Sequence, residues 1–239
     1  MSDEARADQP SIEAAGSSAP SPADIIDPWD GDPRLPEFFG AAWPAVESFH
    51  DYLVEDGELR GLIGPRELAR LWERHLVNSA AVVPFLPEQG VIVDVGSGAG
   101  LPGIVVAAMR PHAQVVLVEP MERRTVWLDD VVQRTGLTNV EVRRARAQDL
   151  EGALEADAAT ARAVASLDKL FRWIAPLVRD GGAVVALKGA RAADELAAAA
   201  NVMKKVGLTD GAVHEAPTID GIEPTRVVTA RRGRGPRVR

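Results

Sequence analysis

The sequence of 239 residues contains no cysteine. This absence excludes disulfide bonds, zinc sites with thiolate ligands and a catalytic cysteine nucleophile. Long apolar runs are also missing, because even the longest ones, such as residues 82–86 and 184–187, are far too short to span a membrane. Residues 1–33 lack the basic start and the apolar core of a signal peptide. We therefore expect a cytoplasmic protein without a membrane partner.

Positive charge is scarce as well. The formal net charge is −8, so the overall field of the protein is not expected to attract a nucleic acid. The charges are unevenly spread, however. Residues 1–33 carry eight acidic side chains and one arginine, whereas residues 231–239 carry five arginines and no acid. A polyanion could therefore still bind at local basic patches.

Composition and periodicity divide the chain into four parts. Residues 1–34 are predicted to be a disordered acidic tail, because Ser, Pro, Ala and Asp bury too little apolar area to offset the entropy of ordering. Residues 35–89 have apolar side chains at helical spacing and predict a small helical segment. Residues 90–230 alternate between strands and helices, and residues 231–239 form a basic tail.

The alternating part predicts a sheet covered by helices. Five strands rich in Val, Ile and Leu are expected at residues 91–95, 114–119, 140–144, 159–164 and 183–188. Helices are expected at residues 102–110, 121–135, 167–179 and 192–206. Two further strands, near residues 211–217 and 226–230, are close enough in sequence to pair as a hairpin. The result is an α/β fold with a mostly parallel seven-stranded sheet and helices on both faces.

The most specific motif follows the first of these strands and reads D-V-G-S-G-A-G-L-P-G from Asp94 to Gly103. Glycines let the backbone turn sharply and approach a ligand closely, and the start of the next helix offers free N–H groups. The spacing differs from the G-x-G-x-x-G of dinucleotide-binding proteins, because Leu101 stands where the last glycine belongs. A phosphate-binding G-K-S/T sequence is also absent. A nicotinamide or flavin cofactor, and a tight turn without a ligand, remain alternatives.

Two carboxylates indicate which ligand suits this loop. Asp94 would repel a pyrophosphate but would favour a cationic, amine-bearing ligand. Glu119 ends the second predicted strand, 25 residues later, where a carboxylate can accept hydrogen bonds from both ribose hydroxyls of an adenosine. S-adenosylmethionine has an ammonium, a sulfonium and a ribose but no phosphate. It is therefore the expected cofactor, approached closely by Gly96 and Gly98.

The glycine motif resembles the corresponding run of the RsmG (GidB) family of 16S ribosomal RNA methyltransferases, which methylate N7 of guanine. Three further segments agree in the same order. R-H-L-V-N-S from Arg74 is similar to the family's R-H-x-x-D/N-S, R-A-V-A-S-L from Arg162 to its S-R-A-x-A-S-L, and A-L-K-G from Ala186 to its A-L-K-G. The likeness covers about residues 45–230. Residues 55–64 depart from the W-N…N-L-T stretch of many relatives, so no contact is carried over there.

The resemblance implies a Rossmann-like class I methyltransferase that modifies N7 of a specific guanine in 16S rRNA. Its partner would be 16S rRNA or the small ribosomal subunit, and we expect a monomer. Together with the carboxylates and glycines above, the implied cofactor-binding set is Asp94, Gly96, Gly98, Leu101, Glu119, Ala147, Gln148 and Arg162. Asp149 competes with its neighbours for the contact to adenine.

The absence of other catalytic motifs agrees with N7 as the acceptor. Methylation of pyrimidine C5 usually needs a cysteine, and methylation of an exocyclic amine usually involves an Asn/Asp-Pro-Pro-Tyr/Phe clamp after the fourth strand. The chain has neither. Guanine N7 carries no proton, so the protein mainly positions donor and acceptor. Arg162 and Lys188 are the positioning candidates, and no metal site is expected.

Five residues are candidates for binding the substrate: His75, Asn78, Arg123, Arg124 and Lys188. For His75 and Asn78, ordinary packing or capping is the alternative, and for Arg123 and Arg124 it is a solvated helix start. Lys188, at the end of the fifth predicted strand, is the best single candidate for a phosphate or base contact.

Two other classes of function remain open. The acidic pI of about 5.1 would favour a small-molecule methyltransferase. A non-catalytic ribosome-assembly factor that binds S-adenosylmethionine is the other alternative. The ordered matches outside the glycine motif favour RNA, because cofactor binding alone would not require them. The intact glycine motif and Glu119 argue against an inactive pocket.

Overall fold

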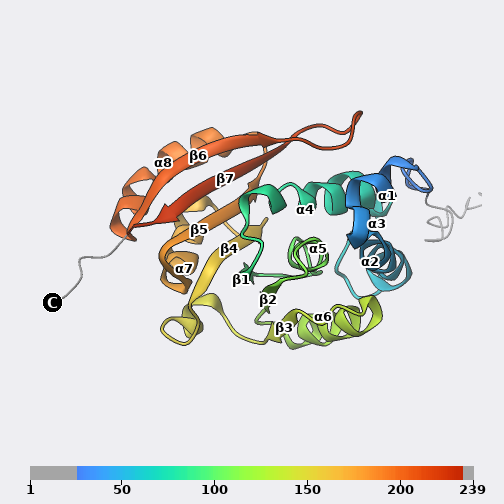
Figure 1. The fold of residues 1–239 in the computed structure, drawn as a ribbon, viewed down its shortest axis with the longest axis horizontal. Coiled ribbons are helices and arrows are strands. Elements are labelled where there is room, and N and C mark those ends of the chain that lie inside the picture. The colour runs from blue at the N-terminus through green and yellow to red at the C-terminus, as the bar shows by residue number, and fades with distance from the viewer. Residues whose placement is uncertain (1–25, 234–239) are drawn as a thin grey trace, which may run out of the picture.

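The computed structural model describes residues 26–233, and the strands of this part form one sheet. Their order is β3-β2-β1-β4-β5-β7-β6 (Figure 1). The bounds are β1 (Gly90–Val95), β2 (Ala113–Val118), β3 (Val140–Arg143), β4 (Ala156–Arg162), β5 (Val178–Lys188), β6 (Leu208–Ala216) and β7 (Thr225–Arg232). Strands β1 to β5 are parallel, and β7 pairs antiparallel with β5 and β6. The predicted seven-stranded, mostly parallel sheet is confirmed.

Helices cover both faces of this sheet. Their bounds are α1 (Arg34–Phe39), α2 (Trp43–Asp56), α3 (Pro65–Leu68), the π-helix η3 (Leu71–Val77), α4 (Asn78–Ala80), α5 (Gly103–Met109), α6 (Glu122–Thr135), α7 (Leu167–Ile174) and α8 (Ala192–Lys205). Short 3-10 turns lie at Gly40–Ala42, Val83–Phe85, Ala147–Leu150 and Ala175–Leu177. Within the described residues, no helix is both long and apolar enough to cross a membrane.

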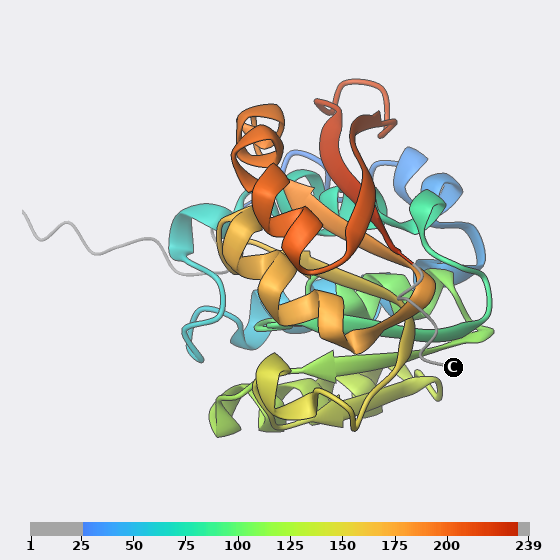
Figure 2. The same ribbon diagram turned by 90° about the vertical axis from the view of Figure 1, so that its left-hand side faces the viewer.

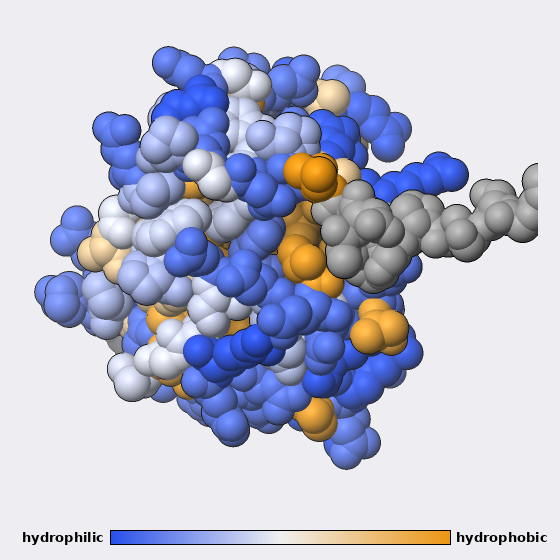
Figure 3. Space-filling view, turned by 90° about the vertical axis from the view of Figure 1, so that its right-hand side faces the viewer, coloured by the Kyte–Doolittle hydropathy of each residue, from blue (hydrophilic) through white to orange (hydrophobic). Residues whose placement is uncertain are grey.

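The alternation of side chains along β1 shows how the two faces are filled. Ile92 belongs to the core that α2, α5 and α6 cover, whereas its neighbour Val93 belongs to the core under α7 and α8. Figure 2 shows α7 and α8, in orange, in front of the sheet. Figure 3 shows the face on the side of α1 and α2, where hydrophobic residues form only separate spots.

Two predicted elements end elsewhere than expected. The helix expected at residues 167–179 stops at Ile174, because Pro176 lacks the N–H that a continuing helix needs, and β5 then begins at Val178. The strand expected at residues 159–164 ends at Arg162. Ala163 follows with a φ of 54°, a left-handed conformation that a strand does not contain. This turn redirects the chain at the edge of the sheet.

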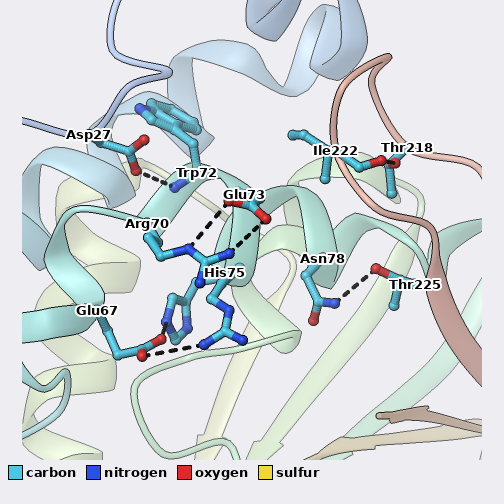
Figure 4. A network of polar contacts seen from close by, with 11 residues as sticks. Asp27, Glu67, Arg70, Trp72, Glu73, His75, Asn78, Thr218, Ile222 and Thr225 are labelled. Carbon is cyan, nitrogen blue, oxygen red and sulfur yellow. Dashed lines mark hydrogen bonds and ion pairs between the residues drawn. The ribbon is translucent and has the colours of Figure 1, made fainter. Parts of the chain in front are cut away.

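Residues 26–33 are packed against the protein, although their composition predicts a disordered acidic tail. Asp27 is 3% exposed and accepts hydrogen bonds from the backbone N–H groups of Trp29 and Trp72, both at 3.0 Å. Asp30 accepts a hydrogen bond from the indole Nε1 of Trp72 at 2.9 Å. Figure 4 shows Asp27 beside Trp72. The buried Asp27 and the more exposed Asp30 thus anchor the segment to the start of η3, whereas residues 1–25 lie outside the described part.

The far end of the chain also differs from its expected boundary. Arg231 and Arg232, which were expected in the basic tail, are the last residues of β7. In the sheet Arg231 pairs with Ala183 of β5. Residues 234–239 lie outside the described part.

The sheet also fixes where a site can form. In parallel strands the carboxyl ends lie at one edge, so the loops after β1, β2 and β4 meet there. Strand β1 lies between β2 and β4. After β1 the chain first forms β2 and β3 on one side of it, and later forms β4 and β5 on its other side. Such a reversal of strand order opens a crevice at the carboxyl ends of the strands.

Candidate active site

A cavity of about 520 Å³ lies at this edge of the sheet. We call it the glycine-loop cavity. It is lined by residues of the glycine loop, by the connection from β2 to α6, by the end of β4 and by the N-terminal helical segment. It brings together five of the predicted cofactor-binding residues: Gly96, Gly98, Leu101, Glu119 and Arg162. Its size is within the usual range for small-molecule sites.

The glycine loop needs glycine for both conformation and space. Gly96 has a φ of 72°, and a Cβ atom there would lie 2.9 Å from a methyl group of Val164 across the cavity wall. Gly98 also has a positive φ of 56°. The carbonyl of Ala99 accepts a hydrogen bond from the indole of Trp127 at 2.9 Å, which fastens the loop to α6. The glycine loop is thus a fixed wall of the cavity, and a ligand can approach its backbone closely.

Glu119 fixes the loop from the cavity side. This carboxylate is 2% exposed. Its Oε2 accepts a hydrogen bond from the Gly98 N–H, and its Oε1 accepts one from the Met121 N–H, both at 3.0 Å. Arg124 lies 3.6 Å from Oε2. Because a carboxylate oxygen has two lone pairs, each oxygen can accept a further hydrogen bond from a ligand hydroxyl.

Asp94 lies behind the loop and does not line the cavity, contrary to the expectation that it would face a cationic ligand. It is fully buried, and its Oδ2 accepts a hydrogen bond from the Gly103 N–H at 3.1 Å. Its Oδ1 has no hydrogen-bond partner among the described residues. Burial raises the pKa of this carboxyl to about 7. Asp94 therefore supports the end of the loop from within the core.

A chain of three polar side chains forms another wall. Arg162 donates hydrogen bonds to the carbonyl of Arg74 at 3.1 Å and to Nδ1 of His75 at 3.0 Å, and Nε2 of His75 lies 2.9 Å from Glu67. Since arginine only donates, Nδ1 must accept, and Nε2 carries the hydrogen that Glu67 accepts. Figure 4 shows the contact between Glu67 and His75. We call these residues the Glu67–His75–Arg162 chain.

Burial and nearby charges keep the Glu67–His75–Arg162 chain in one protonation state at pH 7. Burial and the positive charge of Arg162 lower the pKa of His75 to about 4, so the imidazole is neutral at pH 7. Burial lowers the pKa of Arg162 to about 10, which still leaves the guanidinium charged. The nearby carboxylates of Asp94 and Glu67 act in the opposite direction on Arg162. A neutral acceptor therefore faces a charged donor.

The family can be assigned with this geometry in hand. Residues 43–219 match the family model of GidB, described as rRNA small subunit methyltransferase G. The chain belongs to this family. A relative of that name from Beutenbergia cavernae is 49% identical over 192 residues, which cover 80% of this chain and 91% of the relative. Another from Salinispora arenicola is 46% identical over 222 residues, which cover 90% and 92%.

Solved structures support the fold of this family member. A tRNA methyltransferase from Aquifex aeolicus superimposes with a TM-score of 0.52 at 16% identity, over 66% of this chain and 69% of the other. Fibrillarin from Aeropyrum pernix, solved with natively bound S-adenosyl-L-methionine, gives 0.50 at 17% identity, over 64% and 76%. At such identities the likeness concerns the fold alone. The expected Rossmann-like class I methyltransferase fold is confirmed.

A second cavity of about 450 Å³ adjoins the glycine-loop cavity and shares His75, Arg162 and Ala163 with it. We call it the acceptor-side cavity. Asn78, Lys188 and Glu195 also line it. Ala163 lines both cavities and has a positive φ, and such strained residues occur preferentially at functional sites.

Lys188 does not present a free ammonium to this cavity, which corrects the expectation of a phosphate or base contact. Its side chain is 9% exposed, and Nζ donates to the carbonyl of Ala165 at 2.7 Å and to Glu195 at 2.8 Å. Glu195 lies on α8 and also accepts a hydrogen bond from the Leu167 N–H. Lys188 therefore ties the loop after β4 to α8.

The other candidates divide between the cavities and the surface. Asn78 donates to the hydroxyl of Thr225 at 2.8 Å and lines the acceptor-side cavity. Arg124 lines the glycine-loop cavity, whereas its neighbour Arg123 is exposed and lines neither of the two cavities. The adenine candidates Ala147 and Gln148 begin the 3-10 turn after β3 and do not line the glycine-loop cavity.

Three features of the site carried no recognised sequence signal. Glu67 is eight residues before its partner His75, a spacing at which helical neighbours do not meet. Helix η3, which carries His75, is a π-helix, and apolar spacing alone does not separate this rare form from an α-helix. The residues from Leu62 to Gly64 also line the cavity, in the stretch where the sequence departs from its relatives.

Proposed function

We propose that the protein transfers the methyl group of S-adenosylmethionine to N7 of a guanine in 16S rRNA. The observation that carries this proposal is the pair of adjoining cavities with the shared wall of His75, Arg162 and Ala163. One cavity has the glycine loop and a buried carboxylate, and the other leads away from it. Two ligands can therefore meet at one boundary.

The residues of the glycine-loop cavity fit S-adenosylmethionine. The absence of a side chain at Gly96 leaves room for close approach, since a Cβ atom would already touch Val164. Glu119 has spare lone pairs for ribose hydroxyls at the edge of the cavity. Two arginines line the cavity and both already have partners, Arg124 beside Glu119 and Arg162 with His75.

The reaction needs position more than proton transfer. When bound, S-adenosylmethionine supplies an electrophilic methyl group for an in-line displacement. Guanine N7 attacks with an in-plane lone pair that carries no proton, so a general base is unnecessary. His75 is neutral and already bonded at both ring nitrogens, and it therefore acts by holding Arg162 in place. The rate gain then comes from orientation of the two reactants.

The proposal includes a monomeric enzyme in the cytoplasm. In the described residues the large exposed hydrophobic side chains are few: Ile26, Leu59, Met121 and Val126. Few such residues leave little apolar surface for a permanent partner subunit. The relatives' name, which places their substrate in the small ribosomal subunit, supports action where ribosomes are found.

The test is methylation of small ribosomal subunits isolated from cells that lack this gene. Purified full-length protein and labelled S-adenosylmethionine are added, and the rRNA is digested and examined by mass spectrometry. We expect one 7-methylguanosine per subunit. Gly96→Leu, which fills the approach path, should abolish the reaction, whereas Arg172→Gln, a charge loss on the exposed face of α7, should not. Unmodified subunits with an otherwise folded, cofactor-binding protein would refute the proposal.

A further inference from the structure

A third cavity, of about 350 Å³, continues from the acceptor-side cavity, with which it shares Asn78, Lys188 and Gly189. We call it the arginine cavity. Arg70 and Arg74 contribute to it from the region of η3, and Arg226 contributes from the start of β7. Elements that are far apart in the sequence thus bring three arginines to one hollow.

The arginine cavity is positive in a negative protein. Three arginines line it, namely Arg70, Arg74 and Arg226, whereas the charge of Lys188, which also lines it, is already paired with Glu195. Two acidic side chains, Glu73 and Glu223, line it as well, so the arginines and these two acids give a formal charge of +1. The whole chain has a formal charge of −8. An anion is therefore attracted to this hollow rather than to the surface in general.

The three arginines are held by exposed ion pairs only. Arg70 lies 2.9 Å from Glu73, Arg74 lies 3.6 Å from Glu67, and Arg226 lies 3.5 Å from Glu215. Between 40% and 52% of each arginine side chain is exposed. Such surface pairs are weak, so a phosphate can replace or share them. Figure 4 shows the guanidinium of Arg70, the residue just before η3, beside Glu73 of η3.

A hydrogen bond fixes the distance between the two parts of the chain that carry these arginines, the region of η3 and the start of β7. Asn78 at the start of α4 donates to the hydroxyl of Thr225 at the start of β7, 147 residues away in the sequence. Figure 4 shows this contact between the helix and the last part of the chain. Arg74 is one helical turn before Asn78, and Arg226 directly follows Thr225. The arginines therefore approach an anion from fixed positions.

We propose that the arginine cavity binds a backbone phosphate of the RNA strand next to the acceptor nucleotide, with Arg70, Arg74 and Arg226 as donors. This inference rests on the proposed function. Guanidinium groups match phosphate oxygens with two parallel hydrogen bonds. A phosphate contact fixes the register of the strand without reading its sequence. Phosphate, base and cofactor then occupy three consecutive cavities.

The test compares Arg70→Gln and Arg226→Gln with the matched control Arg172→Gln. Arg172 is an exposed arginine on α7 that lines none of the three cavities. Its replacement by glutamine changes the net charge by the same amount as the two cavity variants do. Methylation of small ribosomal subunits is followed at several salt concentrations. We expect each cavity variant to raise KM by about tenfold. The slope of log kcat/KM against log salt concentration should become shallower by about 0.7 to 0.9 for each phosphate that is no longer neutralised.

Two further measurements keep the result interpretable. The affinity for S-adenosylmethionine should equal that of the unchanged protein, which shows that the variants fold, and Arg226→Lys should restore part of the KM of the unchanged protein. If the unchanged protein does not methylate subunits, the proposed function fails first. If it does, and both cavity variants behave like Arg172→Gln in KM and in salt dependence, the phosphate site is refuted while the proposed function stands.

Discussion

Replacement of Glu119 by alanine tests the core of the cofactor assignment. The change removes the acceptor for two backbone N–H groups, those of Gly98 and Met121, each at 3.0 Å. It also removes the carboxylate next to Arg124. Hydrogen bonds to a charged group contribute about 1.5–3 kcal/mol each when one partner is deleted. The open cavity lets water reach the freed N–H groups, which reduces the loss.

Glu119→Ala also removes the acceptors for the ribose hydroxyls, so we expect it to weaken the binding of S-adenosylmethionine by about 1–3 kcal/mol, or about 5- to 150-fold. Isothermal titration calorimetry measures this directly. Glu119→Gln keeps one acceptor oxygen and should show a smaller loss. The matched control is Glu122→Gln, because the Glu122 side chain is 69% exposed, pairs with Arg144 and does not line the cavity.

This experiment must distinguish a variant that has lost its folded structure from a folded variant that has lost affinity for the cofactor. The melting temperature of each variant is measured without ligand, and a variant that is unfolded at the titration temperature is excluded. If folded Glu119→Ala binds the cofactor as tightly as Glu122→Gln does, Glu119 has no part in the cofactor site. The ribose contact would then have to come from another residue of the glycine-loop cavity.

Three further predictions concern the walls of the site. Arg60→Gln should weaken cofactor binding several-fold in calorimetry, because Arg60 holds the loop whose residues 62–64 line the cavity. Its guanidinium contacts Tyr52, Asp56, Asp130 and Trp127. Lys188→Met should lower kcat while cofactor affinity stays unchanged, since its ammonium holds the loop after β4; equal loss of both would contradict this role. His75→Gln should change the pH dependence of urea unfolding. Between about pH 6.5 and pH 4 the His75 side chain binds a proton in the unfolded chain but not in the native protein, in which its pKa is about 4. As the pH falls through this range, the unchanged protein should lose up to about 1.4 kcal/mol per pH unit relative to the variant, and parallel profiles would refute this.

The sheet was predictable because its strands are buried on both faces. Runs such as residues 91–95 contain only large apolar side chains before Asp94, and helices separate them, so a parallel sheet is the one arrangement that covers both faces. The glycine motif and Glu119 were equally visible, because each directly follows a strand. Their meeting in one cavity follows from parallel strands alone.

The partners of charged side chains were not predictable in this way. Lys188 follows a strand and resembles a free contact residue, but its partner Glu195 comes from α8, which packs against the same edge. Asp94 resembles a ligand contact, but the start of α5 at Gly103 brings a backbone N–H to it from behind the loop. Such pairings depend on how whole helices pack. Residue type and local spacing do not contain that information.

The N-terminal helical segment is a part of the site and not an addition to the methyltransferase fold. Asp27 accepts the Trp72 N–H at the start of η3, and His75 on the same helix accepts a hydrogen bond from Arg162 at the end of β4. Asn78, directly after η3, holds the start of β7. Helix η3 and the turn of α4 that continues it therefore connect the first described residues, the boundary of the two cavities and the last strand. Because a π-helix has an uncommon backbone geometry, these contacts from three sides give a physical reason for its stability.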